Sequence, residues 1–249
     1  MPSFFITGAS RGIGLGLVAE LLKDPKNSVL ATARDPAGSK GLQDLVAKYP
    51  KGRLGTLTLD VNSPEQIANA AKEAAKFFPS GLDYFIHNAG YWEQAFTPVE
   101  TLDTGAFEKE IAFYTVSVVH ILREFKSLVQ KSTEKKFIFI SSVAASLTLV
   151  PNVGEVGIPY SVGKVAQNML VRKWGIVNKE QGIVVAIIHP GFVDTDMGQA
   201  ALDYFRAKDP NAKAISVQES VDGVLKVAFA AKLEETTSFW AYSGDVLPW

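Results

Sequence analysis

The sequence predicts an α/β fold in which a doubly wound parallel sheet, flanked by helices, forms a single domain. Short apolar runs rich in β-branched residues alternate with longer stretches of helical periodicity, which is the pattern of repeated βαβ units. The apolar runs are almost continuously hydrophobic, as is typical of strands that helices cover on both faces. No repeat, low-complexity tract or linker interrupts the 249 residues, so we expect one domain spanning residues 1–249.

The expected elements follow one another along the whole chain. The strands are expected at residues 3–7, 28–32, 54–58, 84–87, 137–141 and 184–189. The helices are expected at residues 14–23, 64–77, 106–131, 160–179 and 217–231. Ser63 ahead of Pro64 is typical of a helix start, and Pro25, Pro79 and Gly182 fall where helices should end.

Two segments interrupt the alternation, residues 148–159 and residues 197–216. In open α/β sheets, ligands bind beyond the carboxyl ends of the strands. We therefore expect both segments to form loops or short helices that shape a substrate pocket. By contrast, the lysine-rich stretch 131–136 predicts a solvated loop.

The composition argues against several classes of function. The 25 basic and 26 acidic residues are dispersed along the chain, so neither nucleic acid nor a membrane is expected as a partner. There is no cysteine, and the spacing of the three histidines does not match a zinc site, so we expect no bound metal. The apolar start is too short for a signal peptide, and no apolar run reaches the roughly 20 residues that cross a bilayer. A cytoplasmic protein is expected.

A glycine-rich turn joins the first strand to the first helix. The sequence of residues 7–14 is Thr-Gly-Ala-Ser-Arg-Gly-Ile-Gly. Glycines let the backbone turn tightly and approach a pyrophosphate, while the helix N-terminus offers free N–H groups. Spacing alone fits a simple turn equally well, but the place between a strand and a helix favours a dinucleotide site. The residues expected to hold the dinucleotide here are Gly8, Ser10, Arg11, Gly12, Ile13 and Gly14.

The end of the second strand predicts which dinucleotide binds. A carboxylate at this point accepts hydrogen bonds from the ribose of NAD, whereas a 2′-phosphate calls for a cation. Here the chain presents Ala33 and Arg34, and Arg11 can reach the same region. Because a planar guanidinium suits a phosphate, we expect NADP(H). The alternative is that Arg34 is merely exposed and that Asp35 binds the ribose of NAD.

Six motifs occur in a fixed order and cover nearly the whole chain. They are the glycine turn at 7–14, Asp60-Val61, Asn88-Ala89-Gly90, Ser141-Ser142, Tyr160-Ser161-Val162-Gly163-Lys164 and Pro190-Gly191-Phe192-Val193-Asp194-Thr195. In this order the chain resembles the short-chain dehydrogenase/reductase family, whose fold is Rossmann-type. The long segment between Ser142 and Tyr160, the turn at 31–34 and the ending 243–249 look like the carbonyl-reductase-like branch found in fungi and animals.

The resemblance implies further contacts with the cofactor. By resemblance, Asp60 and Val61 hold the adenine, Asn88 lines the ribose, and Lys164 binds the nicotinamide ribose. The full set of further cofactor contacts that it implies is Asp60, Val61, Asn88, Ala89, Gly90, Tyr160, Lys164, Pro190, Val193 and Thr195. From the residues alone, Asp60 fits a strand-end cap and residues 88–90 fit a tight turn equally well.

Tyr160 and Lys164 form the expected catalytic pair. Reduction of a carbonyl needs a proton for the oxygen that becomes negative in the transition state. A free tyrosine has a pKa of about 10. Lys164 lies one helical turn after Tyr160, where its charge is expected to lower the pKa of Tyr160. The resemblance adds Ser142 as the residue that holds the carbonyl oxygen. A Tyr and a Lys at this spacing are, by themselves, more often a surface pair.

Tyr114 departs from the family pattern. It occupies the position where the family usually has an asparagine that supports a water-linked proton path behind the lysine. One interpretation is that the hydroxyl of Tyr114, Thr115 or Ser117 carries that path instead, and the other is that catalysis is weakened or altered.

Several aromatic residues and the histidines have less specific signals. Aromatic side chains that fit either a pocket mouth or the core are Tyr91, Trp92, Phe96, Phe192 and Trp240. His87 and His189 are expected as strand-end residues rather than acids, and His120 as part of helix packing.

The sequence therefore predicts an NADP(H)-dependent oxidoreductase that reduces a ketone or aldehyde, or runs the reverse reaction, with Tyr160 as general acid or base. Its partner would be a small carbonyl or alcohol substrate, and a homodimer or homotetramer is possible. The alternatives are an NAD-linked alcohol dehydrogenase and a nucleotide-binding regulator with weak or no turnover. The substrate itself is not predicted.

Overall fold

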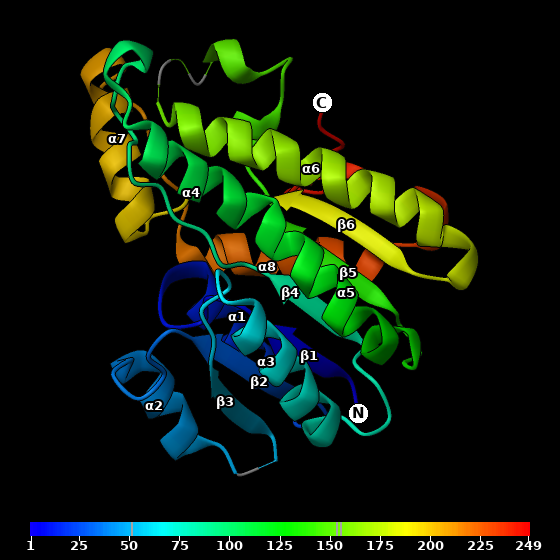
Figure 1. Ribbon diagram of the computed structural model, residues 1–249. Helices are drawn as coiled ribbons and strands as arrows, with labels where there is room; N and C mark the ends of the chain where they lie inside the picture. Colours follow the sequence, from blue (N-terminus) through cyan, green and yellow to red (C-terminus); the bar gives the residue numbers. More distant parts are fainter. Residues whose placement is uncertain (51, 153, 155) are drawn as a thin grey trace.

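Figure 1 shows the computed structural model, which describes residues 1–50, 52–152, 154 and 156–249. Within these residues, seven parallel strands form one sheet in the order β3-β2-β1-β4-β5-β6-β7. The strands are β1 (Ser3–Ile6), β2 (Ser28–Ala33), β3 (Leu54–Thr58), β4 (Tyr84–His87), β5 (Lys136–Ile140), β6 (Val184–His189) and β7 (Phe239–Ala241). The six strands expected from the sequence are confirmed to within one residue at each end, whereas β7 is an addition.

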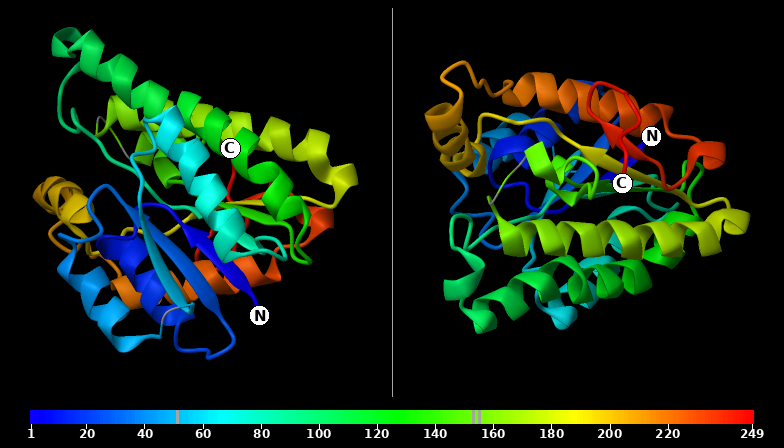
Figure 2. Two further views of the ribbon diagram at one scale, coloured as in Figure 1. Left: turned by 60° about the horizontal axis from the view of Figure 1, so that its bottom comes forward. Right: turned by 90° about the horizontal axis from the view of Figure 1, so that it is seen from above.

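Helices cover both faces of the sheet, so the molecule has three layers (Figure 2). One face carries α3 (Pro64–Phe77), α4 (Thr104–Tyr114), α5 (Val116–Gln130) and α6 (Ile158–Asn178). The other face carries α1 (Gly12–Leu21), α2 (Lys40–Lys48) and α8 (Val217–Ala230). A further helix, α7 (Asp196–Lys208), follows β6 near the edge where the parallel strands end. The doubly wound α/β fold is therefore confirmed.

Alternate side chains of each strand supply two separate cores. On β5, Phe137 and Phe139 pack with α3, α5 and α6, whereas Ile138 and Ile140 pack with α1 and α8. Successive side chains of a strand point to opposite faces of the sheet. Both faces of β5 are thus buried in apolar contacts, which is why the strand is continuously hydrophobic in sequence.

The helices differ from expectation at two points. The single helix expected at 106–131 is divided into α4 and α5 at Thr115, whose φ of −123° and ψ of −68° are not helical. The second difference is α2, which was not expected from the sequence.

The segment 197–216, which interrupts the alternation of strands and helices in the sequence, contains most of α7, and this agrees with the expectation of a loop or short helix. Across the described part of the chain, no helix is long and apolar enough to span a membrane.

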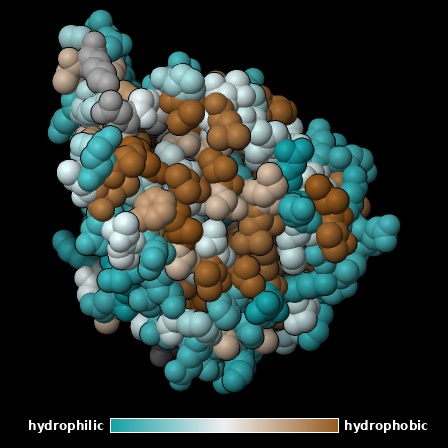
Figure 3. Space-filling model, turned by 45° about the horizontal axis from the view of Figure 1, so that its top comes forward, coloured by the Kyte–Doolittle hydropathy of each residue, from teal (hydrophilic) through white to brown (hydrophobic). Residues whose placement is uncertain are grey.

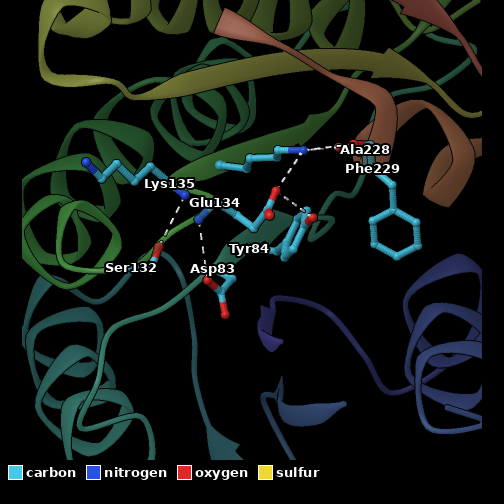
Figure 4. A network of polar contacts seen from close by, with 8 residues as sticks. Asp83, Tyr84, Ser132, Glu134, Lys135, Ala228 and Phe229 are labelled. Atoms are coloured by element: carbon cyan, nitrogen blue, oxygen red, sulfur yellow. Dashed lines mark hydrogen bonds and ion pairs between the residues drawn. The ribbon is translucent and has the colours of Figure 1, made fainter. Parts of the chain in front are cut away.

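The stretch 131–136 is not simply a solvated loop, because Lys136 begins β5 and is 5% exposed. Its ammonium lies 3.1 Å from a Glu134 carboxylate oxygen and donates to the Phe229 carbonyl at 2.8 Å. The Tyr84 hydroxyl also donates to Glu134, at 3.1 Å (Figure 4). This network fastens the amino-terminal end of β5 to the end of α8, at the edge of the sheet away from the carboxyl ends of the strands.

The strand order reverses between β1 and β4. From β1 the chain proceeds outward through β2 to β3, and then returns to β4 on the other side of β1. Such a switch point leaves a crevice beyond the carboxyl ends of the two strands, which is where ligands of this fold class bind. The glycine turn follows β1, and residues 88–90 follow β4.

Candidate active site

A cavity of about 1000 Å³ opens at the carboxyl edge of the sheet. Every residue that was predicted from the sequence to bind the cofactor or to take part in catalysis lines this cavity. In sequence order, the first of them is Gly8 and the last is Thr195. The structure therefore brings together motifs that lie up to 187 positions apart in the numbering, although their individual roles remain predictions.

The glycine turn leaves room for a ligand because side chains are excluded at two positions. Gly8 has a φ of +69°, and a Cβ there would lie 2.7 Å from the Ala89 Cα. A Cβ on Gly14 would lie 2.3 Å from the Gly8 carbonyl oxygen and 2.5 Å from the Asn88 amide nitrogen. Backbone N–H groups at the start of α1 thus border the cavity directly, which suits a pyrophosphate.

Side chains after β4 and β1 hold the glycine turn in place. The Asn88 amide donates to the carbonyls of Thr7 and Gly8, at 3.1 and 2.9 Å. The Thr7 hydroxyl in turn accepts from the backbone N–H groups of Asn88 and Ala89, at 3.1 and 3.0 Å. Asn88 therefore supports the loop as well as lining the cavity.

The far end of the cavity presents a cation. Arg34 is exposed and lines the cavity, and within the described residues no carboxylate forms an ion pair with it. The Asp35 carboxylate instead accepts from the Gly38 N–H at 2.9 Å, and Asp35 is not among the described residues that line the cavity. Asp60 accepts from the Asn62 N–H at 2.9 Å, so it acts as a strand-end cap while still facing the cavity.

Arg11 joins two walls of the cavity. Its guanidinium lies 2.7 Å from a carboxylate oxygen of Asp196, the first residue of α7, and both side chains are about three-quarters exposed. An exposed ion pair of this kind is weak, at about 0–1 kcal/mol. Arg11 can therefore exchange Asp196 for an anionic ligand at little cost.

The expected catalytic residues meet at one wall. Tyr160 and Lys164 come from the first two turns of α6, and Ser142 follows β5. The Tyr160 hydroxyl forms a hydrogen bond with the Ser142 side chain. The Lys164 ammonium donates to the Ile140 carbonyl at 2.8 Å and lies 5.9 Å from the centroid of the Tyr160 ring.

The electrostatics of this wall differ from expectation. Burial raises the pKa of Tyr160 to about 12, although its hydrogen bond with Ser142 opposes the rise. Burial also lowers the pKa of Lys164 to about 7. The expectation that Lys164 lowers the pKa of Tyr160 is therefore wrong for this structure, because desolvation sets the direction and the ammonium of Lys164 hydrogen-bonds to the Ile140 carbonyl instead.

Both strand-end histidines are neutral groups. Burial lowers the pKa of His87 to about 3 and that of His189 to about 4. The His189 ring nitrogen Nδ1 accepts from the Val143 N–H at 3.2 Å, and His189 lines the cavity. His189 was not predicted from the sequence as a residue of the site. Its place directly before the motif at 190–195 could have indicated that it borders the cavity.

Aromatic side chains surround the catalytic wall. Tyr91, Trp92 and Phe192 line the cavity, in agreement with the interpretation that they form a pocket mouth. The ring centroids of Trp92 and Tyr160 lie 5.7 Å apart. Phe96 is half exposed and packs against Trp92 at 6.2 Å. Trp240 is placed differently: it belongs to β7 and packs against the core formed with α1 and α8. Trp240 is therefore a partly buried residue at the margin of this core and not one of the described residues that line the cavity.

The two interrupted segments border the catalytic end. Asn152 and Val156 from residues 148–159, and Met197, Ala201 and Phe205 from α7, line the main cavity. A neighbouring cavity of about 410 Å³ shares Asn152, Phe192 and Phe205 with it. Two residues of the segment 148–159, Val153 and Glu155, lie outside the described residues.

The fold and this cavity are those of the dinucleotide-binding α/β class, and comparisons with known proteins identify the family. A family model described as short chain dehydrogenase matches residues 3–204. The chain therefore belongs to the short-chain dehydrogenase family and is an oxidoreductase.

Individual relatives match over nearly their whole length. An uncharacterised oxidoreductase of Schizosaccharomyces pombe is 31% identical over 98% of this chain and 97% of its own. A norsolorinic acid ketoreductase of Dothistroma septosporum is 30% identical over 99% of this chain and 92% of its own. The crystal structure of an NADPH-bound carbonyl reductase from chicken fatty liver superimposes with a TM-score of 0.88 at 30% identity, covering 100% of this chain and 99% of that one.

Proposed function

We propose that this protein is an NADP(H)-dependent reductase of ketones or aldehydes in which Tyr160 is the general acid. The observation that carries the proposal is the convergence of Ser142, Tyr160 and Lys164 on one wall of a cavity whose other end holds the glycine turn and Arg34. The similarity to an NADPH-bound carbonyl reductase and to a ketoreductase supports it.

The residues of the chain would divide the work of the reaction. When bound, the nicotinamide supplies the hydride that reaches the carbonyl carbon. The Ser142 hydroxyl and the Tyr160 hydroxyl would hold the carbonyl oxygen, and Tyr160 would donate its proton as negative charge develops there. With a pKa of about 12, Tyr160 is protonated at neutral pH, which is the state that a reductase needs.

The choice of NADP(H) rests on Arg34. A guanidinium without a carboxylate partner at the end of β2 can form charge-assisted hydrogen bonds with a 2′-phosphate. The use of the Asp35 carboxylate within its own turn argues against the alternative in which Asp35 binds the ribose of NAD.

One experiment tests the choice of cofactor. Titrations followed by nicotinamide fluorescence give the Kd of NADPH and of NADH for the wild type, Arg34→Ala and Lys72→Ala, an exposed position on α3 that makes the same charge change away from the cavity. We expect Arg34→Ala to weaken NADPH binding by about tenfold or more and to leave NADH binding nearly unchanged. Equal weakening for both dinucleotides would overturn the assignment.

A second experiment tests the chemistry. Turnover of a panel of ketones and aldehydes is compared between the wild type and Tyr160→Phe, with NADPH binding measured for both. Loss of a positioned general acid is expected to slow turnover by about a hundredfold or more without loss of NADPH binding. Tight NADPH binding without turnover of any carbonyl would favour the alternative of a nucleotide-binding regulator.

We also propose that two or more copies of the chain associate. Apolar side chains gather on the side of the molecule where α6 lies (Figure 3). On α6, Met169, Ile176 and Val177 are each more than half exposed, as is Val116 on α5. A homodimer or homotetramer would cover these residues. Light scattering after size-exclusion chromatography tests this, and a monomer at every protein concentration would contradict it.

A further inference from the structure

Lys164 is held behind the catalytic wall by neutral groups. It is 2% exposed, and its ammonium donates to the Ile140 carbonyl and lies 3.4 Å from the Gln167 side-chain oxygen. Among the described residues, no carboxylate forms an ion pair with it. The remaining close contact is with an aromatic ring, since the ammonium nitrogen lies 4.6 Å from the centroid of the Tyr114 ring. An ammonium over the face of a ring is attracted by the ring quadrupole, most strongly where water is excluded.

The neighbouring helix is built to admit the Tyr114 ring. Tyr114 is fully buried at the end of α4, facing Gly163 of α6. A Cβ on Gly163 would lie 2.5 Å from the Tyr114 Cδ2 and 3.1 Å from its Cγ. Glycine is a poor helix former, so its presence within the first turns of α6 needs a reason of this kind. The ring occupies the space that a side chain at residue 163 would fill.

The Tyr114 hydroxyl has a separate attachment. It donates to the Tyr91 carbonyl at 2.5 Å and accepts from the Tyr91 N–H at 2.9 Å. The Thr115 hydroxyl donates to the Ile111 carbonyl at 2.6 Å, and that of Ser117 donates to the Phe113 carbonyl. All three hydroxyls are thus bound to the backbone. The interpretation in which one of them replaces the family's asparagine in a water-linked proton path stays a prediction.

We propose that Tyr114 is a positioning residue whose ring face stabilises the Lys164 ammonium and whose hydroxyl fixes the pocket wall at Tyr91. This inference rests on the proposed function, because Lys164 matters only beside a catalytic Tyr160. The Tyr114 and Tyr160 rings also meet edge to face, with centroids 5.6 Å apart. One side chain therefore contacts Lys164, Tyr160 and a residue of the cavity lining.

The charge state of Lys164 is the property that this contact should control. Burial brings the pKa of Lys164 down to about 7, so a modest change in its surroundings alters its charge near neutral pH. The other titratable groups on the elements packed around it are His87 on β4, Tyr160 on α6, and Glu110 on α4. Burial lowers the pKa of His87 to about 3 and so keeps it neutral, and Glu110, whose pKa burial raises, forms no ion pair with Lys164 among the described residues. The ring of Tyr114 thus acts beside the Ile140 carbonyl and the Gln167 side-chain oxygen as a group that favours the ammonium.

The test measures the ionisation of Lys164 without any turnover. Protein labelled with carbon-13 at the lysine ε-carbons is titrated by NMR, and the Lys164 signal is assigned by its loss in Lys164→Met. Tyr114→Phe keeps the ring and removes the hydroxyl, whereas Tyr114→Leu removes the ring. We expect the titration midpoint of Lys164 to be unchanged in Tyr114→Phe and to fall by about one pH unit in Tyr114→Leu. Gly163→Ala, which forces the ring to move, should shift the midpoint in the same direction and serves if the Leu variant does not fold.

The hydroxyl is tested separately by kinetics. Tyr114→Phe should raise the KM for a ketone substrate severalfold, because the Tyr91 wall is released, while the Lys164 midpoint stays in place. Equal midpoints in the wild type and in both ring-disturbing variants, or a Phe variant that shifts as far as the Leu variant, would overturn the inference. A shifted midpoint in a protein that reduces no carbonyl would confirm the contact between the Tyr114 ring and the Lys164 ammonium but remove the proposed function, and with it the positioning role.

Discussion

Gly14 provides the sharpest test of how the glycine turn is built. In Gly14→Ala the new Cβ would lie 2.3 Å from the Gly8 carbonyl oxygen and 2.5 Å from the Asn88 amide nitrogen, and both atoms must move. The Asn88 amide donates a hydrogen bond to that Gly8 carbonyl at 2.9 Å, and it also donates to the Thr7 carbonyl at 3.1 Å. Each lost hydrogen bond costs about 0.5–1.5 kcal/mol. The better helix propensity of alanine returns up to about 1 kcal/mol. The free energy of unfolding should therefore fall by only about 0–2 kcal/mol.

The effect on dinucleotide binding should be larger than the effect on stability. A displaced Gly8 and Asn88 move the backbone N–H groups that would contact the pyrophosphate, and a hydrogen bond to a charged group is worth about 1.5–3 kcal/mol. Loss of one such bond raises the Kd of NADPH by about tenfold to a hundredfold.

The assay pairs urea unfolding with an NADPH fluorescence titration. Gly105→Ala is the control, since it adds the same methyl group in the first turn of α4, where the nearest atom, Asp103 Oδ1, is 3.3 Å away. Gly105→Ala should bind NADPH as the wild type does. If Gly14→Ala bound NADPH as tightly as this control, the reasoning about the glycine turn would be refuted.

Two further predictions concern stability. The folded-state pKa values of His87, about 3, and His189, about 4, lie below the usual 6.5, so the unfolded chain binds these protons more readily than the folded chain. The free energy of unfolding should thus be highest above pH 6.5 and decline as the pH falls toward 4, by up to about 2.7 kcal/mol per pH unit while both groups contribute; urea unfolding at a series of pH values checks this, and a flat profile between pH 6.5 and 5 would contradict it. Lys136→Met removes the cation from the network of Figure 4 and should lower the free energy of unfolding by about 1–3 kcal/mol with no change in NADPH binding. Weakened NADPH binding in that variant would contradict the separation of this network from the site.

The location of the site could be predicted from the sequence, whereas the details of its chemistry could not. Parallel strands end at one edge of a sheet, so motifs that follow β1, β4, β5 and β6 had to meet there once the strands were recognised. The alternation of apolar runs and helical stretches was enough to recognise six strands. It failed for β7, which has only three residues, and it left open whether Trp240 on that strand lies in the core or at the pocket mouth.

Properties that depend on contacts between helices could not be predicted. The break between α4 and α5 falls at Thr115, where neither proline nor glycine marks it. The pKa of Tyr160 was predicted in the wrong direction because spacing along a helix indicates which charges are near but not how deeply each group is buried. The sequence alone does not explain why a glycine stands at position 163 within a helix. The reason is the Tyr114 ring of another helix, which fills the space that a Cβ on Gly163 would occupy.

The central claim is that Tyr160 delivers a proton while hydride passes from NADPH to a carbonyl carbon. The most direct measurement is a single turnover with NADPH in which both hydrogens at the nicotinamide C4 position are replaced by deuterium, with the alcohol product analysed by mass spectrometry. The account predicts one deuterium on the former carbonyl carbon in the wild type, and formation of the same product at least about a hundredfold more slowly in Tyr160→Phe. An unlabelled alcohol, or a Phe variant that forms labelled alcohol at the wild-type rate, would contradict it.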